Sequence, residues 1–218
     1  MQLLDRFLDP SSVSLKICGV TRRNEAEELA ALGVDAVGFN FWPHSKRYLP
    51  VAGAAWLKDL SGEILRIGVF VNQPLDFAIG LYQDGFIDGI QLHGDEPQAA
   101  VEALQKARIP CIRALGVKAK ADLADAVNFK VSALLLDTHA PGIYGGTGEV
   151  FDWNLAREFM DQHPTLPVIL AGGITPGNAA EAARIVRPAA LDVASGAELS
   201  PGLKDFQKVS ALLSALKH

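Results

Sequence analysis

The chain has 218 residues, of which 49% are hydrophobic and 21% charged, and its formal net charge is −5. This composition is typical of a globular protein with a sizeable core, and the length suits one α/β barrel of roughly 200–250 residues better than two domains. The negative charge argues against a nucleic-acid partner, and the sequence lacks the run of about 18 apolar residues that a membrane span needs.

The chain begins with MQLLDRFLDPSSVS, a segment with Arg6 as its one basic residue and no long apolar stretch. This segment does not have the pattern of a secretory signal, so we expect a cytoplasmic protein. Cys18 and Cys111 are the two cysteines, and neither they nor the five histidines show the spacing of a metal site. We therefore expect no disulfide, no metal and no membrane partner.

Short apolar segments alternate with longer amphipathic ones along the whole chain. The short segments are rich in Val, Ile and Leu, as strands buried on both faces are. They predict strands at Ser14–Cys18, Val34–Phe39, Leu65–Val71, Asp88–Leu92, Cys111–Leu115, Ala133–Leu136, Pro167–Leu170 and Ala190–Val193. The amphipathic segments predict helices at Arg23–Leu32, Val51–Leu60, Leu75–Tyr82, Pro97–Ala107, Lys120–Val127, Asp152–Gln162, Pro176–Arg187 and Leu203–Leu216.

Eight strands that alternate with eight helices indicate a parallel α/β fold. An open doubly wound sheet is the alternative, but its GxGxxG motif is missing after the first strand, where Cys18-Gly19-Val20-Thr21 stands instead. The pattern therefore favours a single-domain (βα)8 TIM barrel over residues 14–218. Residues 1–13 are expected to form an N-terminal extension.

Polar residues stand at the carboxyl ends of nearly all the predicted strands. In a TIM barrel this end carries the active site. The apolar neighbours of these residues, such as Ile90 and Leu92 beside Gln91, are expected to face the helices while the polar set faces the mouth. The strand-end residues are Lys16, Cys18, Asn40, Asn72, Gln91, His93, Arg113 and Asp137, followed by Gly172-Gly173 and Ser195-Gly196.

Two glycine-containing loops follow the seventh and eighth strands, at Gly172-Gly173 and Ser195-Gly196. Loops at these two positions often bind a phosphate group in this fold through their backbone N–H groups. A small-molecule phosphosugar is therefore the expected ligand. A third stretch, Tyr144 to Gly148, is either another anion site or a mobile flap over the ligand.

The ordered set of these motifs resembles the phosphoribosylanthranilate isomerase family, and the resemblance runs from Leu15 onward. The motifs are KICG at 16–19, GFNF at 38–41 with SKR at 45–47, GVFVN at 68–72, QLHGDE at 91–96, LDT at 136–138, GGTG at 145–148, FDW at 151–153, LAGG at 170–173 and DVASG at 192–196. Each piece alone is weak, but the ordered set is specific.

The resemblance implies an enzyme of tryptophan biosynthesis that acts without cofactor or metal. It would convert N-(5′-phosphoribosyl)anthranilate to 1-(2-carboxyphenylamino)-1-deoxyribulose 5-phosphate by an Amadori rearrangement. Cys18 would be the general base and Asp137 the general acid, and Arg47 would bind the anthranilate carboxylate. Gly172, Gly173, Ser195 and Gly196 would bind the phosphate. From their strand-end positions, Gln91 and His93 are candidates for substrate contact, and His93 could instead only form hydrogen bonds within the mouth.

Simple chemistry agrees with these roles. A carboxylic acid in an apolar pocket can protonate a leaving ring oxygen, and a thiolate can remove a proton from carbon. Lys16, two residues before Cys18, is expected to lower the pKa of the thiol. The chain departs from the family's usual pattern at Lys46, which replaces a proline between Ser45 and Arg47.

Other functions stay open at this stage. An indole-glycerol-phosphate synthase would need a catalytic lysine with glutamates in the mouth, and a ribulose-phosphate epimerase would need histidines that bind metal. A non-catalytic sensor of phosphorylated ligands would explain the glycine loops but not Cys18 and Asp137. The sequence allows either a monomer or a homodimer.

Overall fold

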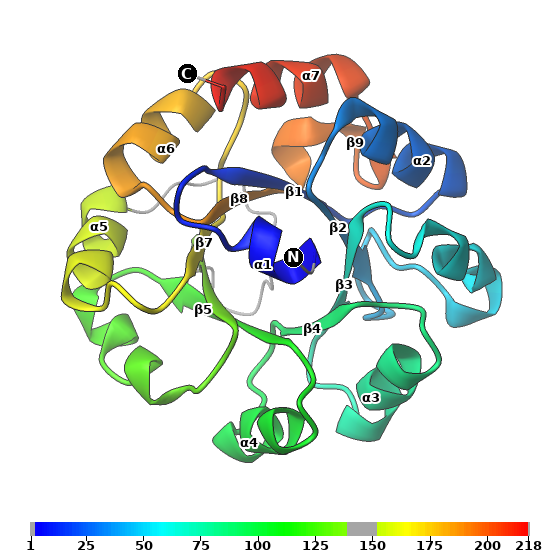
Figure 1. Cartoon of the computed structure of the whole chain (residues 1–218), viewed down its shortest axis with the longest axis horizontal. Helices are drawn as coiled ribbons and strands as arrows, with labels where there is room; N and C mark the ends of the chain where they lie inside the picture. Colours follow the sequence, from blue (N-terminus) through cyan, green and yellow to red (C-terminus); the bar gives the residue numbers. More distant parts are fainter. Residues whose placement is uncertain (1–2, 139–151, 218) are drawn as a thin grey trace.

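A computed structural model describes residues 3–138 and 152–217 of the chain. In this part eight parallel strands close into a barrel in the order β1 to β8, which Figure 1 shows in a view down its axis. Every strand begins and ends within two residues of its predicted bounds, and the predicted (βα)8 barrel is confirmed. The strands are β1 (Ser14–Cys18), β2 (Ala36–Asn40), β3 (Leu65–Phe70), β4 (Gly89–Leu92), β5 (Cys111–Val117), β6 (Ala133–Thr138), β7 (Val168–Leu170) and β8 (Ala190–Val193).

Helices surround the barrel, and most follow their predicted bounds. They are α2 (Arg23–Leu32), α3 (Leu75–Gln83), α4 (Gln98–Lys106), α5 (Trp153–Gln162), α6 (Ala179–Val186) and α7 (Phe206–Ala215). Two predicted α-helices are wrong, because those segments form short 3₁₀ turns: η1 (Val51–Gly53) and η2 (Ala55–Leu60), then η3 (Lys120–Leu123) and η4 (Ala126–Asn128). At the start of η3 the carboxylate of Asp122 accepts from the backbone N–H groups of Lys118 and Ala119, which caps the first turn, but the segment continues only as 3₁₀ turns.

The last helix was predicted to start at Leu203, but in the structure it starts at Phe206. A short 3₁₀ turn, η5 (Ser195–Ala197), follows β8 and leads into a hairpin of β9 (Glu198–Ser200) and β10 (Leu203–Lys204). The helix α7 begins only after Asp205, whose carboxylate accepts from the N–H groups of Gln207 and Lys208. Asp205 is a favoured capping residue, so the sequence did contain the signal for this start.

The strands alternate between two apolar layers. Leu15, Ile17, Ile90 and Leu92 belong to the cluster that packs between barrel and helices. A second cluster fills the barrel interior, with members such as Ala36, Leu65, Ile67, Ile112, Ala114, Ala133, Leu135, Ile169 and Ala190. This period of two leaves the interior free for polar groups toward the carboxyl ends of the strands.

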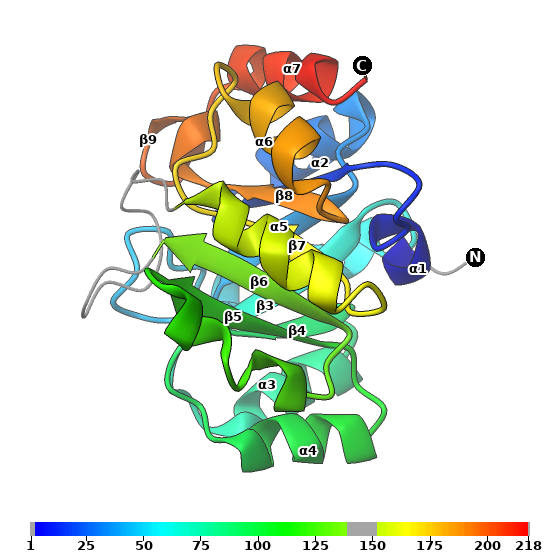
Figure 2. The same ribbon diagram turned by 90° about the vertical axis from the view of Figure 1, so that its left-hand side faces the viewer.

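The helix α1 (Leu3–Phe7) lies across the amino-terminal end of the barrel, on the axis in Figure 1 and at one end of the strands in Figure 2. Phe7 is 0% exposed and belongs to the interior cluster, and Leu3, Leu4 and Leu8 pack against the same cluster. Residues 3–8 therefore close the amino-terminal end of the barrel. The boundary expected at residue 14 stays a prediction.

Within residues 3–138 and 152–217, no helix is both long and apolar enough to cross a membrane.

Candidate active site

A pocket lies at the carboxyl ends of the strands, the end that the sequence predicted for the active site. Among the described residues, every strand except β5 contributes to its lining through its last residues or the loop that follows. Seven of the expected site residues line it: Cys18, Arg47, His93, Asp137, Gly172, Gly173 and Ser195.

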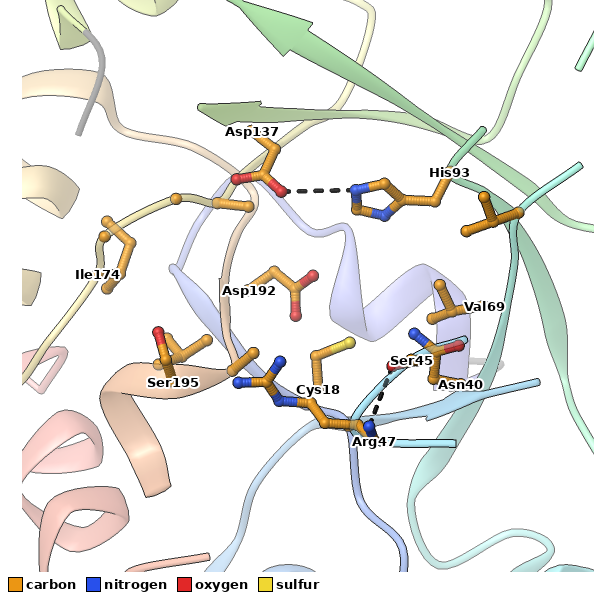
Figure 3. Close-up of a pocket in the computed structure, with 17 residues that line it drawn as sticks. Cys18, Asn40, Ser45, Arg47, Val69, His93, Asp137, Ile174, Asp192 and Ser195 are labelled. Atoms are coloured by element: carbon orange, nitrogen blue, oxygen red, sulfur yellow. Dashed lines mark hydrogen bonds and ion pairs between the residues drawn. The ribbon is translucent and has the colours of Figure 1, made fainter. Parts of the chain in front are cut away.

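The thiol and the carboxylate expected to act in catalysis lie on different sides of this pocket. Figure 3 shows Cys18 and Arg47 at one side, Asp137 and His93 at the other, and Asp192 between them. Asp137 Oδ1 accepts from the N–H of Thr138 at 2.8 Å, and its Oδ2 lies 3.5 Å from His93 Nε2. The carboxyl group is therefore held in place while one edge stays toward the pocket.

The remaining two expected residues, Gln91 and Gly196, do not line the pocket. Gln91 is 0% exposed, and its amide bonds to Lys16 Nζ at 3.0 Å and to His93 Nδ1 at 2.7 Å. Gln91 therefore holds two neighbours of the pocket instead of facing it. Gly196 lies just behind Ser195, where a side chain would overlap the carbonyl oxygen of Ile174.

The expectation that Lys16 gives Cys18 a lowered pKa is wrong, because the pKa of this thiol is raised. Burial and the charge of Asp192 raise the pKa of Cys18 above its ordinary value of 9.0, although Lys16, Lys204 and Arg47 act in the opposite direction. The lysine does favour the thiolate, but it is neutralised by a carboxylate that the sequence-based argument left out. Desolvation and a like charge outweigh the three cations.

Lys16 and Asp192 form a buried ion pair at the floor of the pocket, with 2.9 Å between Nζ and Oδ2. They are Cα partners across the β1–β8 seam that closes the barrel. Burial opposes the charge of Lys16, but Asp192 and the Cys18 thiol outweigh it and raise the pKa of the lysine. The other oxygen of Asp192, Oδ1, is buried and has no hydrogen-bond partner among the described residues.

Arg47 is already held on one edge. Its Nε and Nη2 donate to the two carboxylate oxygens of Glu198 at 2.9 and 2.7 Å. Lys204 Nζ donates to Glu198 at 2.8 Å and to the carbonyl oxygen of Cys18 at 2.5 Å, so the hairpin of β9 and β10 ties the arginine to β1. A guanidinium offers five N–H donors, so the edge formed by Nη1 and Nη2 can still bind a second carboxylate.

The loop after β7 needs glycine for a steric reason. Gly172 has φ +84°, and a Cβ there would overlap the side chain of Thr138 and lie 2.9 Å from Asp137 Oδ1. The glycine therefore lets this loop approach the end of β6 closely. Any larger residue would push the expected acid and this loop apart.

Some sequence expectations fall outside the pocket, and two charged residues were missed, one that lines the pocket and one that binds Arg47 beside it. Arg113 bonds to Glu96 at 2.6 Å and, like Asn72, does not line the pocket. Asp192 and Glu198 were not identified as site residues. A charged residue in a strand as apolar as Ala190–Val193 needs a buried partner, and Lys16 is the matching cation in the adjoining strand, so this signal was present. Residues 144–148 lie outside the described residues.

Comparisons with known proteins agree with this geometry. A family model described as "N-(5'phosphoribosyl)anthranilate (PRA) isomerase" matches residues 15–215. Curated relatives named N-(5'-phosphoribosyl)anthranilate isomerase include one from Citrifermentans bemidjiense, 41% identical over 93% of this chain and 96% of the relative. Another, from Myxococcus xanthus, is 43% identical over 94% of this chain and 97% of its own length.

A solved structure of phosphoribosyl anthranilate isomerase from Thermotoga maritima superimposes with a TM-score of 0.85 at 35% identity, covering 94% of this chain and 98% of that one. A phosphoribosyl anthranilate isomerase solved in complex with reduced 1-(o-carboxyphenylamino)-1-deoxyribulose 5-phosphate has a TM-score of 0.82 at 34% identity and the same coverage. On these grounds the chain belongs to the N-(5'-phosphoribosyl)anthranilate isomerase family.

Proposed function

We propose that this chain isomerises N-(5′-phosphoribosyl)anthranilate to 1-(2-carboxyphenylamino)-1-deoxyribulose 5-phosphate in tryptophan biosynthesis. The observation that carries the proposal is the composition of the pocket. Around one space it has the thiol of Cys18, the carboxyl group of Asp137, an arginine with one unoccupied edge and the loops that follow β7 and β8. Each of these groups matches one part of the substrate. The family and the relative solved with a reduced form of the product support the same reaction.

The two charged ends of the substrate fit two places in the pocket. The phosphate would bind to the loops at Gly172-Gly173 and Ser195-Gly196, where backbone N–H groups can donate and little side-chain bulk intervenes. The anthranilate carboxylate would bind to the Nη1–Nη2 edge of Arg47, which Glu198 leaves free. Glu198 then acts as a support that fixes the direction of the guanidinium.

The first chemical step opens the ribose ring. The Asp137 carboxyl group donates its proton to the furanose oxygen, the C1–O bond breaks, and the nitrogen lone pair forms a C=N bond to C1. Asp137 is left as a carboxylate, which the N–H groups of Thr138 and His93 can stabilise.

The second step moves the unsaturation along the sugar. Cys18, on the other side of the pocket, removes the proton from C2, and the C2–H electron pair forms a C1=C2 bond while the C=N pair returns to nitrogen. The resulting enaminol becomes the ketone when its hydroxyl proton moves to C1. Cys18 ends with the proton from C2, and Asp137 ends without the proton that it gave to the furanose oxygen, so proton exchange with water restores both groups.

We propose that the enzyme acts in the cytoplasm on a small phosphosugar and binds no nucleic acid, which fits the net charge of −5. A monomer and a homodimer are both compatible with the fold, and one solved relative is described as monomers made from a dimeric enzyme. Light scattering on the purified protein decides between them.

The direct test follows the loss of fluorescence of phosphoribosylanthranilate, generated in the cuvette, after addition of the purified enzyme. We expect the rate of this loss to be proportional to enzyme concentration, and the product to keep the mass of the substrate, as an isomer must, and to carry a ketone. Binding of the substrate without turnover would contradict the proposal and favour a sensor. Turnover to a product with lost carboxylate or altered sugar stereochemistry would favour a synthase or an epimerase.

A further inference from the structure

A continuous chain of polar side chains crosses the pocket floor from Asp192 to Asp137. Lys16 Nζ lies 2.9 Å from Asp192 Oδ2 and 3.0 Å from Gln91 Oε1. Gln91 Nε2 lies 2.7 Å from His93 Nδ1, and His93 Nε2 lies 3.5 Å from Asp137 Oδ2. Lys16 and Gln91 are both 0% exposed, so their hydrogen bonds are shielded from bulk solvent.

The chemistry of Lys16 fixes the direction of this chain. An ammonium group has three donors and no acceptor, so the atom of the Gln91 amide that faces it must be the carbonyl oxygen. The amide nitrogen must then face His93. Because an amide NH₂ group can only donate, the ring atom that it meets, Nδ1, must accept.

The orientation of Gln91 in turn fixes the proton on the imidazole ring. With Nδ1 as an acceptor, the ring proton lies on Nε2, the atom that faces Asp137. A second proton on Nδ1 would point at an amide that has no lone pair to offer. The ring therefore presents an N–H to the Asp137 carboxyl group and is not itself arranged to deliver a proton to substrate.

We propose that Gln91 is a positioning residue, oriented by Lys16, that holds His93 as the Nε2–H tautomer with its N–H directed at Asp137. The consequence for catalysis rests on the proposed function: the N–H of His93 stabilises the carboxylate that Asp137 becomes when its proton passes to the furanose oxygen. A donor placed where charge develops typically contributes on the order of 10²–10³-fold to kcat. Gln91 thus acts on the acid step through another residue and without touching substrate.

The tautomer is measured directly on the wild-type protein. Long-range ¹H–¹⁵N correlation spectra of the uniformly ¹⁵N-labelled enzyme distinguish a ring that carries its proton on Nε2 from one that carries it on Nδ1, and His93→Asn identifies the His93 signals by their loss. We expect the Nε2–H pattern in the substrate-free enzyme. The Nδ1–H pattern would overturn the proposal, and this readout does not depend on whether the protein isomerises anything.

Gln91→Glu sharpens the test because it changes a donor into an acceptor with almost no change in shape. We expect the proton to move to Nδ1, where it faces the new carboxylate, and kcat to fall on the order of 10²-fold with KM changed only a few-fold. Gln98→Glu, an exposed position at the start of α4, is the matched control and should leave both the His93 spectrum and kcat unchanged.

The His93 spectrum and the value of kcat together decide the outcome for Gln91→Glu. A loss of kcat in Gln91→Glu with the Nε2–H pattern retained would overturn the proposal, since the damage would then not pass through the tautomer. If Gln91→Glu fails to fold, the wild-type spectrum still decides. A wild-type enzyme with the Nε2–H pattern but no isomerase activity would sink the proposed function and leave the arrangement of Gln91 and His93 standing.

Discussion

The two ends of the barrel interior are filled by opposite kinds of side chain. At the amino-terminal end, Phe7 closes a cluster of Ala, Leu and Ile that is fully apolar. At the carboxyl end stand Lys16 of β1, Gln91 of β4 and Asp192 of β8, all buried and joined by hydrogen bonds. The comparison indicates that one end maintains the fold and the other holds reactive groups in fixed positions.

The largest effect on rate is expected from replacing Cys18, the proposed general base. Cys18→Ser should leave the free energy of unfolding close to wild type, because the thiol lies at the pocket and not in the apolar cluster, but lower kcat by about 10²–10⁴-fold, since a hydroxyl is a far weaker base. Single-turnover and steady-state rates check this. Cys111→Ser, in the wall between barrel and helices, is the control and should keep its activity. Near wild-type rates in Cys18→Ser would remove the thiol from the mechanism.

The opposite end of the barrel should show the opposite result. Phe7→Ala leaves a cavity in the interior cluster and should lower the free energy of unfolding by about 3–5 kcal/mol, with kcat and KM unchanged below the transition. Urea unfolding followed by circular dichroism measures the loss. Leu199→Ala, at a position 66% exposed, is the control for removal of a large side chain and should cost little. A fall in kcat without loss of stability in Phe7→Ala would break the division between the two ends.

Within the pocket, variants of the residue that binds substrate should change mainly KM, and variants of the residue that acts in the chemistry should change mainly kcat. The anthranilate carboxylate keeps its charge throughout the reaction, so Arg47→Ala should raise KM strongly and change kcat by no more than about tenfold. Asp137→Asn should lower kcat and leave KM nearly unchanged, because its proton is needed only as the ring oxygen leaves. Steady-state kinetics on the purified variants, each checked for a native circular dichroism spectrum, test the difference.

Two further variants control this experiment. Arg47→Lys should recover only part of the affinity, because an ammonium cannot supply two parallel hydrogen bonds. Glu198→Gln keeps one of the two oxygens that accept from Arg47, replaces the other by an NH₂ group and loses the charge, so its KM should lie between wild type and Arg47→Ala. An Arg47→Ala enzyme whose kcat fell as far as that of Asp137→Asn, with KM unchanged, would contradict the assignment.

The smallest expected effect concerns the ionisation of the thiol. Because burial and Asp192 raise the pKa of Cys18 above 9.0, the free enzyme carries mostly the neutral thiol at neutral pH. The value of kcat/KM, which reports on the free enzyme, should therefore rise with pH until the pH passes that pKa. A plateau at neutral pH would contradict this.

Alkylation of the thiol by iodoacetamide gives an independent measure of the same pKa. Burial raises the pKa of Cys111 to about 12, and a Cys111→Ser background removes its contribution altogether. Asp192→Asn should shift the alkylation profile of Cys18 to lower pH and Lys16→Met to higher pH, since they remove charges of opposite sign. Asp84→Asn, on the exposed end of α3, should shift neither.

Sequence patterns predicted local structure well where a segment is decided by its own residues. The strand at Ser14–Cys18 and the helix at Arg23–Leu32 have the predicted bounds, because apolar alternation and helical spacing act over a few neighbours. The α-helix predicted at Val51–Leu60 was wrong. The apolar spacing of this segment suggests a regular helix, but the segment forms two short 3₁₀ turns with a less regular hydrogen-bond pattern. The hairpin of β9 and β10 was missed because two-residue pairing leaves almost no periodicity to detect.

The sequence by itself determined the order of strands and helices, the reactive groups at the strand ends and the family that they resemble. Closure of the barrel decided the rest, because it brings β1 beside β8 and so sets Asp192 against Lys16 and near Cys18. This contact reverses the expected direction of the thiol pKa, and the contact of Arg47 with Glu198 leaves only half of the guanidinium free. Charges act through space over a few ångströms, so their balance depends on partners more than a hundred residues away, which no local pattern can reveal.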